Sequence, residues 1–145
     1  MRPARPCLAI TGFDDPRDAA AVKRAALRIL SVLGVSRLSV DLGAMGRRDA
    51  VRLNRRFRGE TYAADVLSFP LPPPIPGGMA GEVLIRPSVV ARRGAGAGIS
   101  RRRRLARLAV HGVLHVLGYG HDDADQAGIM RALERTGGTK GWRRP

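Results

Sequence analysis

Residues 101–121 contain a helical stretch that is apolar nearly all round from Leu105 to Leu117. A helix without a polar face has to be buried, so we expect this stretch, with Ser100 as its N-cap, to form the central helix of the protein. His111 and His115 are four residues apart and therefore project from one face of the helix, one turn apart. The sequence thus predicts a core helix that carries two imidazoles.

The third and last histidine of the chain, His121, lies just beyond this helix. Gly118 can end the helix in a left-handed conformation that other residues avoid, and the turn can bring His121 back toward His111 and His115. Three converging imidazoles bind Zn²⁺ and leave its fourth position open to water, which is the arrangement of catalytic zinc sites. We therefore predict one zinc ion per chain, the alternative being three structural histidines that only pack.

One residue separates this site from that of the metalloproteases. The spacing His-x-x-x-His-x-x-Gly-x-x-His is that of metzincins, which place a glutamate after the first histidine as the general base. Here that position is Gly112, which has no side chain. The sequence therefore predicts the zinc ligands of a metalloprotease without the glutamate that acts as its general base. This difference argues against proteolysis.

The charge of the chain points to a polyanionic partner. Its 145 residues, enough for one domain, carry 26 Lys and Arg against 12 Asp and Glu, a net charge of +14, and only Lys23 and Lys140 are lysines. Arginine forms bidentate contacts with phosphate, so nucleic acid is the expected partner, with an acidic membrane surface second. A GC-rich genome would explain part of the arginine content but not the lack of acids. Zinc beside this charge favours cleavage of phosphodiester bonds, and in RNA the 2′-hydroxyl is itself an available nucleophile.

No stretch of the sequence indicates secretion or a membrane span. Cys7 is the only cysteine, so neither an internal disulfide nor a cysteine zinc site can form. The apolar run from Cys7 to Ile10 is too short for a signal peptide, and Leu105–Leu117 is shorter than a bilayer requires. We expect a soluble, cytoplasmic protein.

The pattern of elements predicts an α+β fold. We expect a small mixed sheet of about four strands, mostly parallel with one antiparallel hairpin, packed around the histidine helix. The stretch from Pro70 to Gly78 should be an extended loop that joins the two strands of the hairpin. Residues 1–135 should form a single domain and residues 136–145 a flexible basic tail. The expected strands are 7–10, 38–42, 66–69 and 82–85, and the expected helices are 14–33, 49–57, 87–93, 101–117 and 123–133.

Four consecutive arginines, residues 101–104, fill the first turn of the central helix, where cations oppose the helix dipole. Either they form a solvated charged run, or the phosphates of a bound polyanion offset the repulsion. The second interpretation predicts that neutralising these arginines weakens RNA binding and its dependence on salt.

Four segments of the chain resemble the YbeY family of bacterial endoribonucleases and ribosomal RNA maturation factors. The histidine stretch is similar to the family signature His-Gly-x-Leu-His-Leu-x-Gly-Tyr-Asp-His. The other segments resemble, in the order of the family, its Leu-Asn-x-x-Tyr/Phe-Arg-Gly, Thr-Asp-Val-Leu-Ser-Phe-Pro and Gly-Asp-Ile-x-Ile sequences. The four segments are residues 111–121, 53–59, 65–70 and 81–85.

The resemblance implies a zinc-dependent endoribonuclease, specific for single strands, that acts in the maturation of small-subunit ribosomal RNA and in ribosome quality control. It also implies that Arg58 is a catalytic residue facing the metal and the RNA, and that the small ribosomal subunit and its assembly factors are partners. The implied zinc ligands are His111, His115 and His121. The other candidate RNA-contacting residues are Arg86, Arg101 and Arg102.

Three departures from the family pattern and two alternative functions accompany this interpretation. Gly120 stands where the family usually has Asp, Ala64 where it has Thr, and Glu82 where it has Asp. Asp65 is equally compatible with a functional role and with the plain start of a strand. The first alternative is a ribosome-assembly binding factor with a structural metal and no cleavage of its own. The second is a remnant of a metalloprotease, which Gly112 disfavours.

Overall fold

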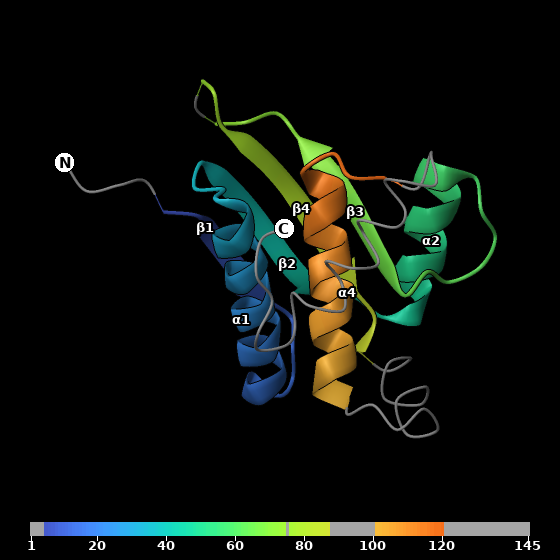
Figure 1. The fold of residues 1–145 in the computed structure, drawn as a ribbon. Coiled ribbons are helices and arrows are strands. Elements are labelled where there is room, and N and C mark those ends of the chain that lie inside the picture. Colours follow the sequence, from blue (N-terminus) through green and yellow to red (C-terminus); the bar gives the residue numbers. More distant parts are fainter. Residues whose placement is uncertain (1–4, 75, 88–100, 121–145) are drawn as a thin grey trace.

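The computed structural model describes residues 5–74, 76–87 and 101–120. The expected helix at 123–133, the tail at 136–145 and most of the expected helix at 87–93 lie outside these ranges and stay predictions. The described part is α+β, as the sequence predicts, with a four-stranded mixed sheet and three helices (Figure 1).

The sheet has the strand order β1-β2-β4-β3. β1 pairs with β2 and β2 with β4 in parallel, whereas β3 pairs with β4 in the antiparallel direction. This arrangement confirms the expected sheet, mostly parallel with one hairpin. The elements are β1 Cys7–Thr11, α1 Pro16–Leu33, β2 Leu38–Ala44, α2 Arg47–Arg58, β3 Val66–Leu71, β4 Met79–Ile85 and α4 Arg101–Val116.

Helix α1 forms where its sequence signals place it. The Asp15 carboxylate caps the helix by accepting a 2.8 Å hydrogen bond from the backbone N–H of Arg17, and Pro16 occupies the first turn. Gly34 ends the helix in the left-handed conformation, with φ of 70°. The buried residues of the helix recur at helical spacing, and Val22, Ala26 and Ile29 are among them.

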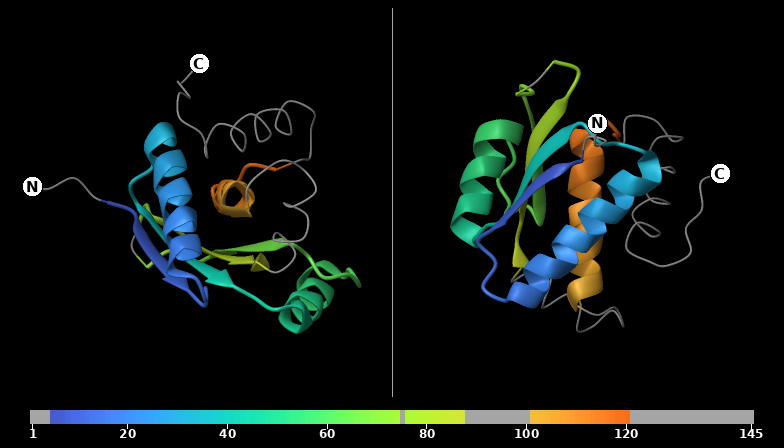
Figure 2. Two further views of the ribbon diagram at one scale, coloured as in Figure 1. Left: turned by 90° about the horizontal axis from the view of Figure 1, so that it is seen from below. Right: turned by 90° about the vertical axis from the view of Figure 1, so that its left-hand side faces the viewer.

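The sheet lies between two helical layers: α1 and α4 cover one face, and α2 lies on the other (Figure 2). Side chains alternate across the strands accordingly. In β4, Val83 and Ile85 point into the larger core under α1 and α4, whereas Leu84 packs against the smaller cluster of buried residues that includes Ala50 of α2.

Helix α4 is the buried central helix that its composition predicts. It packs against α1, β3 and β4, and its fully buried Leu105, Val113 and Leu114 belong to the larger core. The helix lies so close to the sheet that a Cβ atom at Gly81 would be 2.6 Å from both methyl carbons of Val116. Within the described ranges, no helix has the length and hydropathy needed to cross a membrane.

The arginines at the start of α4 have partners within the protein. Helices α1 and α4 begin at the same end of the molecule (the lower end in Figure 1), which brings acids of α1 to this turn. Arg101 Nη2 lies 2.7 Å from Asp18 Oδ2, and Arg102 Nη2 lies 3.3 Å from Asp15 Oδ2. Asp18 is only 2% exposed. Carboxylates of α1 therefore offset part of the repulsion at Arg101 and Arg102, which keep 41% and 43% of their side-chain surface exposed, and both interpretations of the run stay open.

The Asp15 carboxylate at the start of α1 makes the stability of the folded protein depend on pH in the acidic range. The backbone N–H and the guanidinium of Arg17, together with Arg102, hold the pKa of Asp15 below its ordinary value of 3.8, although desolvation acts in the opposite direction. A lowered carboxyl pKa contributes stability that is complete above the ordinary value and is lost as the pH falls through the lowered one.

We therefore expect Asp15→Asn, which keeps a capping oxygen but no charge, to lower the melting temperature at about pH 7 and to have progressively less effect toward about pH 2. Thermal denaturation followed by circular dichroism across this pH range measures the difference. A difference that stays constant with pH would contradict the assignment.

Candidate active site

The two histidines of α4 converge at their Nε2 atoms, which are 3.0 Å apart. Their rings meet edge to face, with centroids 4.6 Å apart and planes at 67°, and both residues are half-buried. This distance fits an N–H···N hydrogen bond between a donor and an acceptor tautomer. It also resembles the geometry of two ligands of one tetrahedral zinc, for which Zn–N bonds of about 2.0–2.1 Å place the nitrogens roughly 3.3 Å apart.

The end of α4 has the geometry that Gly118 predicts. The N–H of Gly118 donates to the carbonyl of His115, the N–H of Tyr119 donates to that of Leu114, and Gly118 has φ of 98°. These paired bonds form a Schellman motif, which turns the chain sharply away from the helix axis. The predicted third ligand, His121, lies outside the described residues. Residues 5–74, 76–87 and 101–120 contain no group of three or more His, Cys, Asp or Glu side chains suited to a metal.

A pocket of about 300 Å³ joins the histidine helix to the end of α2. Arg58 is the last residue of α2, Asp65 directly precedes β3, and His111 lies on α4, so three segments far apart in the sequence meet here. A guanidinium and an imidazole that line one pocket are suited to an anionic group such as a phosphodiester. The residues that line the pocket are Arg58, Tyr62, Ala63, Ala64, Asp65, Val66, Leu108 and His111.

Two buried polar side chains hold the loop that forms this pocket. The side-chain amide of Asn54, fully buried on α2, donates a 2.8 Å hydrogen bond to the carbonyl of Tyr62. The guanidinium of Arg86 donates from Nη1 to the carbonyl of Ala63 at 3.2 Å, and its backbone N–H donates to the carbonyl of Asp65. These bonds fix the loop by satisfying carbonyls that would otherwise lack donors.

Arg86 has a structural role that its sequence context does not predict. The residue is only 4% exposed and supports the loop through its bond to Ala63, and its predicted RNA contact stays a prediction. A cation in an otherwise ordinary strand-to-loop segment gives no sign of burial. Arg101 and Arg102 keep exposed surface of 41% and 43%, and their predicted RNA contacts stay predictions.

Gly112 has a packing role that the sequence did not indicate. A Cβ atom on Gly112 would lie 2.3 Å from Cγ1 of Val83, and the hydroxyl of Ser68 donates a 3.1 Å hydrogen bond to the Gly112 carbonyl. The residue therefore faces the sheet, on the side of α4 that contacts β3 and β4. Even a glutamate at this position would meet the core before it could act as a base.

Three residues of the site escaped the sequence reasoning: Asn54, Tyr62 and Ser68. Asn54 and Ser68 lie inside the segments that resemble the YbeY family, which was the available signal. Tyr62 lies outside those segments, and only the tertiary structure reveals it as a 55% exposed aromatic on the pocket wall.

Comparisons with known proteins show which family the sequence resembles. The sequence model of the family described as Endoribonuclease YbeY matches residues 11–140. A protein of Xanthomonas oryzae pv. oryzae named Endoribonuclease YbeY is 44% identical over 94 residues, which cover 61% of this chain and 58% of the relative. One of Neisseria meningitidis with the same name is 37% identical over 107 residues, covering 70% of this chain and 63% of the relative. The match thus spans about three fifths of the length of these relatives.

The fold also resembles a solved structure. The solution structure of TM1509 from Thermotoga maritima superposes with a TM-score of 0.62 over 92% of this chain and 86% of that protein. The two sequences are 20% identical, so this likeness concerns the fold alone.

Proposed function

Because this chain belongs to the YbeY family, we propose that it is a metal-dependent endoribonuclease that cleaves single-stranded RNA. In this proposal one zinc ion is held by His111, His115 and His121, and Arg58 is the catalytic residue that binds the phosphate. The cellular substrate is the precursor of small-subunit ribosomal RNA, in maturation and in ribosome quality control, with the small subunit and its assembly factors as partners. The lone Cys7 is compatible with a cytoplasmic site of action.

The observation that carries the proposal is that Arg58 and His111 line one pocket, with His115 Nε2 3.0 Å from His111 Nε2. A hydrogen-bonded histidine pair on its own would be a common structural feature. The pair gains a chemical meaning because Arg58, an exposed arginine of another helix, lines the pocket that His111 also lines, and because the chain carries a net charge of +14.

The residues fit a zinc ion by two criteria. Neutral imidazole nitrogen is a preferred zinc ligand, and the separation of the two Nε2 atoms is close to that of two ligands on one ion. When bound, zinc would supply Lewis-acid polarisation of a phosphoryl oxygen and acidification of water.

The protein side chains would contribute charge and position. The Arg58 guanidinium would donate hydrogen bonds to the non-bridging phosphate oxygens, where negative charge increases in the transition state. Gly112 provides no base and is packed against Val83, so the nucleophile would be water or the 2′-hydroxyl of the RNA. The loop bonds from Asn54 and Arg86 would keep the pocket wall in place during this step.

The test is cleavage of a fluorescently labelled single-stranded RNA by highly purified protein, before and after treatment with a chelator. We expect cleavage to stop on chelation and to return when zinc is added, while circular dichroism shows the fold retained. Cleavage that survives chelation would contradict the metal-dependent mechanism. Unfolding on chelation, without RNA cleavage by the metal-loaded protein, would favour the assembly factor with a structural metal.

A further inference from the structure

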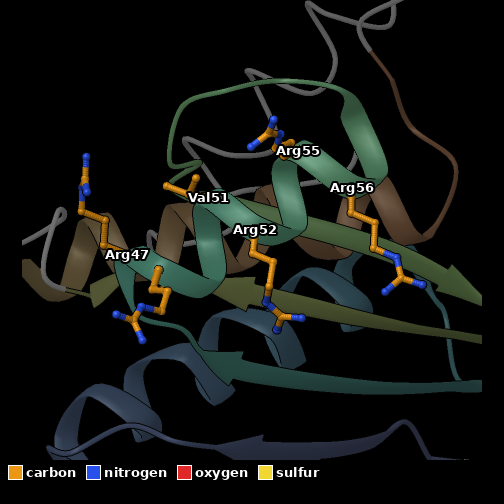
Figure 3. Close-up of a pocket in the computed structure, with 6 residues that line it drawn as sticks. Arg47, Val51, Arg52, Arg55 and Arg56 are labelled. Carbon is orange, nitrogen blue, oxygen red and sulfur yellow. The ribbon is translucent and has the colours of Figure 1, made fainter.

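The exposed side of α2 carries arginines in two rows. Arg47 and Arg55 flank Val51 at intervals of four residues, and Arg48, Arg52 and Arg56 follow the same interval, so each row runs along the helix. Figure 3 shows Arg47 and Arg55 pointing to one side of the helix and Arg52 and Arg56 to the other. Together with Val51 they line a shallow hollow of about 760 Å³. We name this surface the α2 arginine face, defined by Arg47, Arg48, Arg52, Arg55 and Arg56.

The acids of the described residues leave this face largely uncompensated. Arg17, Arg101 and Arg102 pair with Asp15 and Asp18 at the other helical layer. In contrast, α2 contains six arginines and a single acid, Asp49, which pairs with Arg52 at 3.4 Å. Arg47, Arg48 and Arg55 form no ion pair with any carboxylate of the described residues.

Two residues of the α2 arginine face lie where a positive charge does not stabilise the helix. Arg47 and Arg48 begin the first turn of α2, where the helix dipole disfavours positive charge, and both are exposed. At the start of α4 the corresponding repulsion is offset by Asp15 and Asp18, but on α2 only Asp49 lies nearby. An external anion would relieve the repulsion on α2.

A strand of RNA fits this face better than a membrane does. A helix that binds a lipid surface needs a free apolar side. Most of the apolar side of α2 is already used, since Ala50 is fully buried and Leu53 packs on the smaller core cluster. Phe57 is 57% exposed, but its ring packs edge to face against that of Phe69, and one such residue does not make an apolar side. Phosphate groups, in contrast, need only the guanidinium groups that the face presents.

The face also leads to the candidate active site. Arg55 lies three residues before Arg58, so the two are neighbours on the helix surface. Arg58 lines the pocket that contains His111. We propose that the α2 arginine face binds the phosphate backbone of the RNA strand whose reacting phosphate lies in that pocket. This inference rests on the proposed endoribonuclease function and extends the RNA-binding surface beyond Arg58.

The test compares two double variants of equal charge. Arg47→Gln/Arg48→Gln removes two adjacent exposed cations from the face. Lys23→Gln/Arg24→Gln removes two adjacent exposed cations from α1, on the opposite side of the sheet. Binding of a labelled single-stranded RNA to the metal-loaded proteins is measured by fluorescence anisotropy as a function of salt, and a gel of the recovered RNA checks that it is still intact.

We expect the Arg47→Gln/Arg48→Gln protein to bind more weakly than wild type and to show a salt slope smaller by about 1.4, because each single-strand phosphate contact contributes about 0.7. The Lys23→Gln/Arg24→Gln protein should keep the wild-type slope. Arg47→Glu/Arg48→Glu should weaken binding further. Its acids suit the helix N-terminus, so an unchanged or raised melting temperature would exclude unfolding as the cause.

Equal binding by the two Gln variants would overturn the inference, and so would an absence of RNA binding by the wild type. If the wild type binds RNA through this face but does not cleave it when loaded with zinc, the proposed function fails; of the inference, the binding of RNA by the α2 arginine face stands and the link to a reacting phosphate in the pocket fails. If the wild type cleaves RNA but Arg47→Gln/Arg48→Gln binds like the control, only the inference fails.

Discussion

Replacing His115 with alanine is expected to remove bound zinc and to reduce RNA cleavage to the background level. The Nε2 atom of His115 lies 3.0 Å from that of His111, so its loss would take away one of the three proposed ligands. Alanine is the best helix former, and His115 is only half-buried, so α4 should remain folded. Metal content by elemental analysis and cleavage of a labelled single-stranded RNA measure the two losses in one preparation.

Arg58→Gln is the matched variant for this experiment. It removes a charge from the pocket that His111 lines and leaves all three proposed metal ligands unchanged. We expect it to retain zinc and to slow cleavage roughly a hundredfold to a thousandfold, the usual effect of losing one donor to a transition-state oxyanion. Cleavage that persists in His115→Ala, or full activity of Arg58→Gln, would show that the reaction takes place elsewhere.

Gly112→Ala is expected to destabilise the protein by about 1–3 kcal/mol, although alanine is normally the better residue inside a helix. Helix propensity alone would favour the change by about 1 kcal/mol. The new Cβ atom, however, would lie 2.3 Å from Cγ1 of Val83, a fully buried residue on an inner strand that cannot move aside without disturbing the core. Overpacking should therefore outweigh propensity. Urea denaturation of both proteins measures the difference.

Two further variants separate this clash from a general effect of alanine. Gly46→Ala is a control, because a Cβ atom there meets nothing within 4 Å, and it should cost less than about 1 kcal/mol. Val83→Ala removes the methyl carbon that the new Cβ atom of Gly112→Ala would strike. The double variant Gly112→Ala/Val83→Ala should therefore be more stable than the sum of the single changes predicts. Strict additivity would argue against a direct contact between the two positions.

The expectations that held are those with local physical causes. Residues 105–117 are apolar nearly all round the helix, so this helix had to be buried. The proline-rich stretch after β3 could form neither a helix nor an inner strand, so it forms the loop of the hairpin. Gly118 ends α4 because glycine readily adopts the left-handed conformation of that position. His111 and His115 share a face because they are four residues apart on a helix. Each of these outcomes depends on residues within a few positions of one another, so pattern alone is informative.

Other contacts depended instead on which segments, far apart in the sequence, pack together in the fold. Asp15 and Arg102, 87 residues apart, form an ion pair only because α1 and α4 start side by side. The burial of Arg86 has the same kind of cause, since its partner carbonyl belongs to the loop after α2.

The strands, the central histidine helix and its glycine end follow from the sequence alone, because strand alternation, helical period, capping and backbone conformation are encoded locally. Tertiary packing was needed to bring Arg58 and His111 to one pocket, to give Gly112 its contact with Val83 and to pair the arginines at the start of α4 with Asp15 and Asp18. These contacts join residues brought together by the packing of helices on the sheet, and no local pattern specifies which residues such packing makes neighbours.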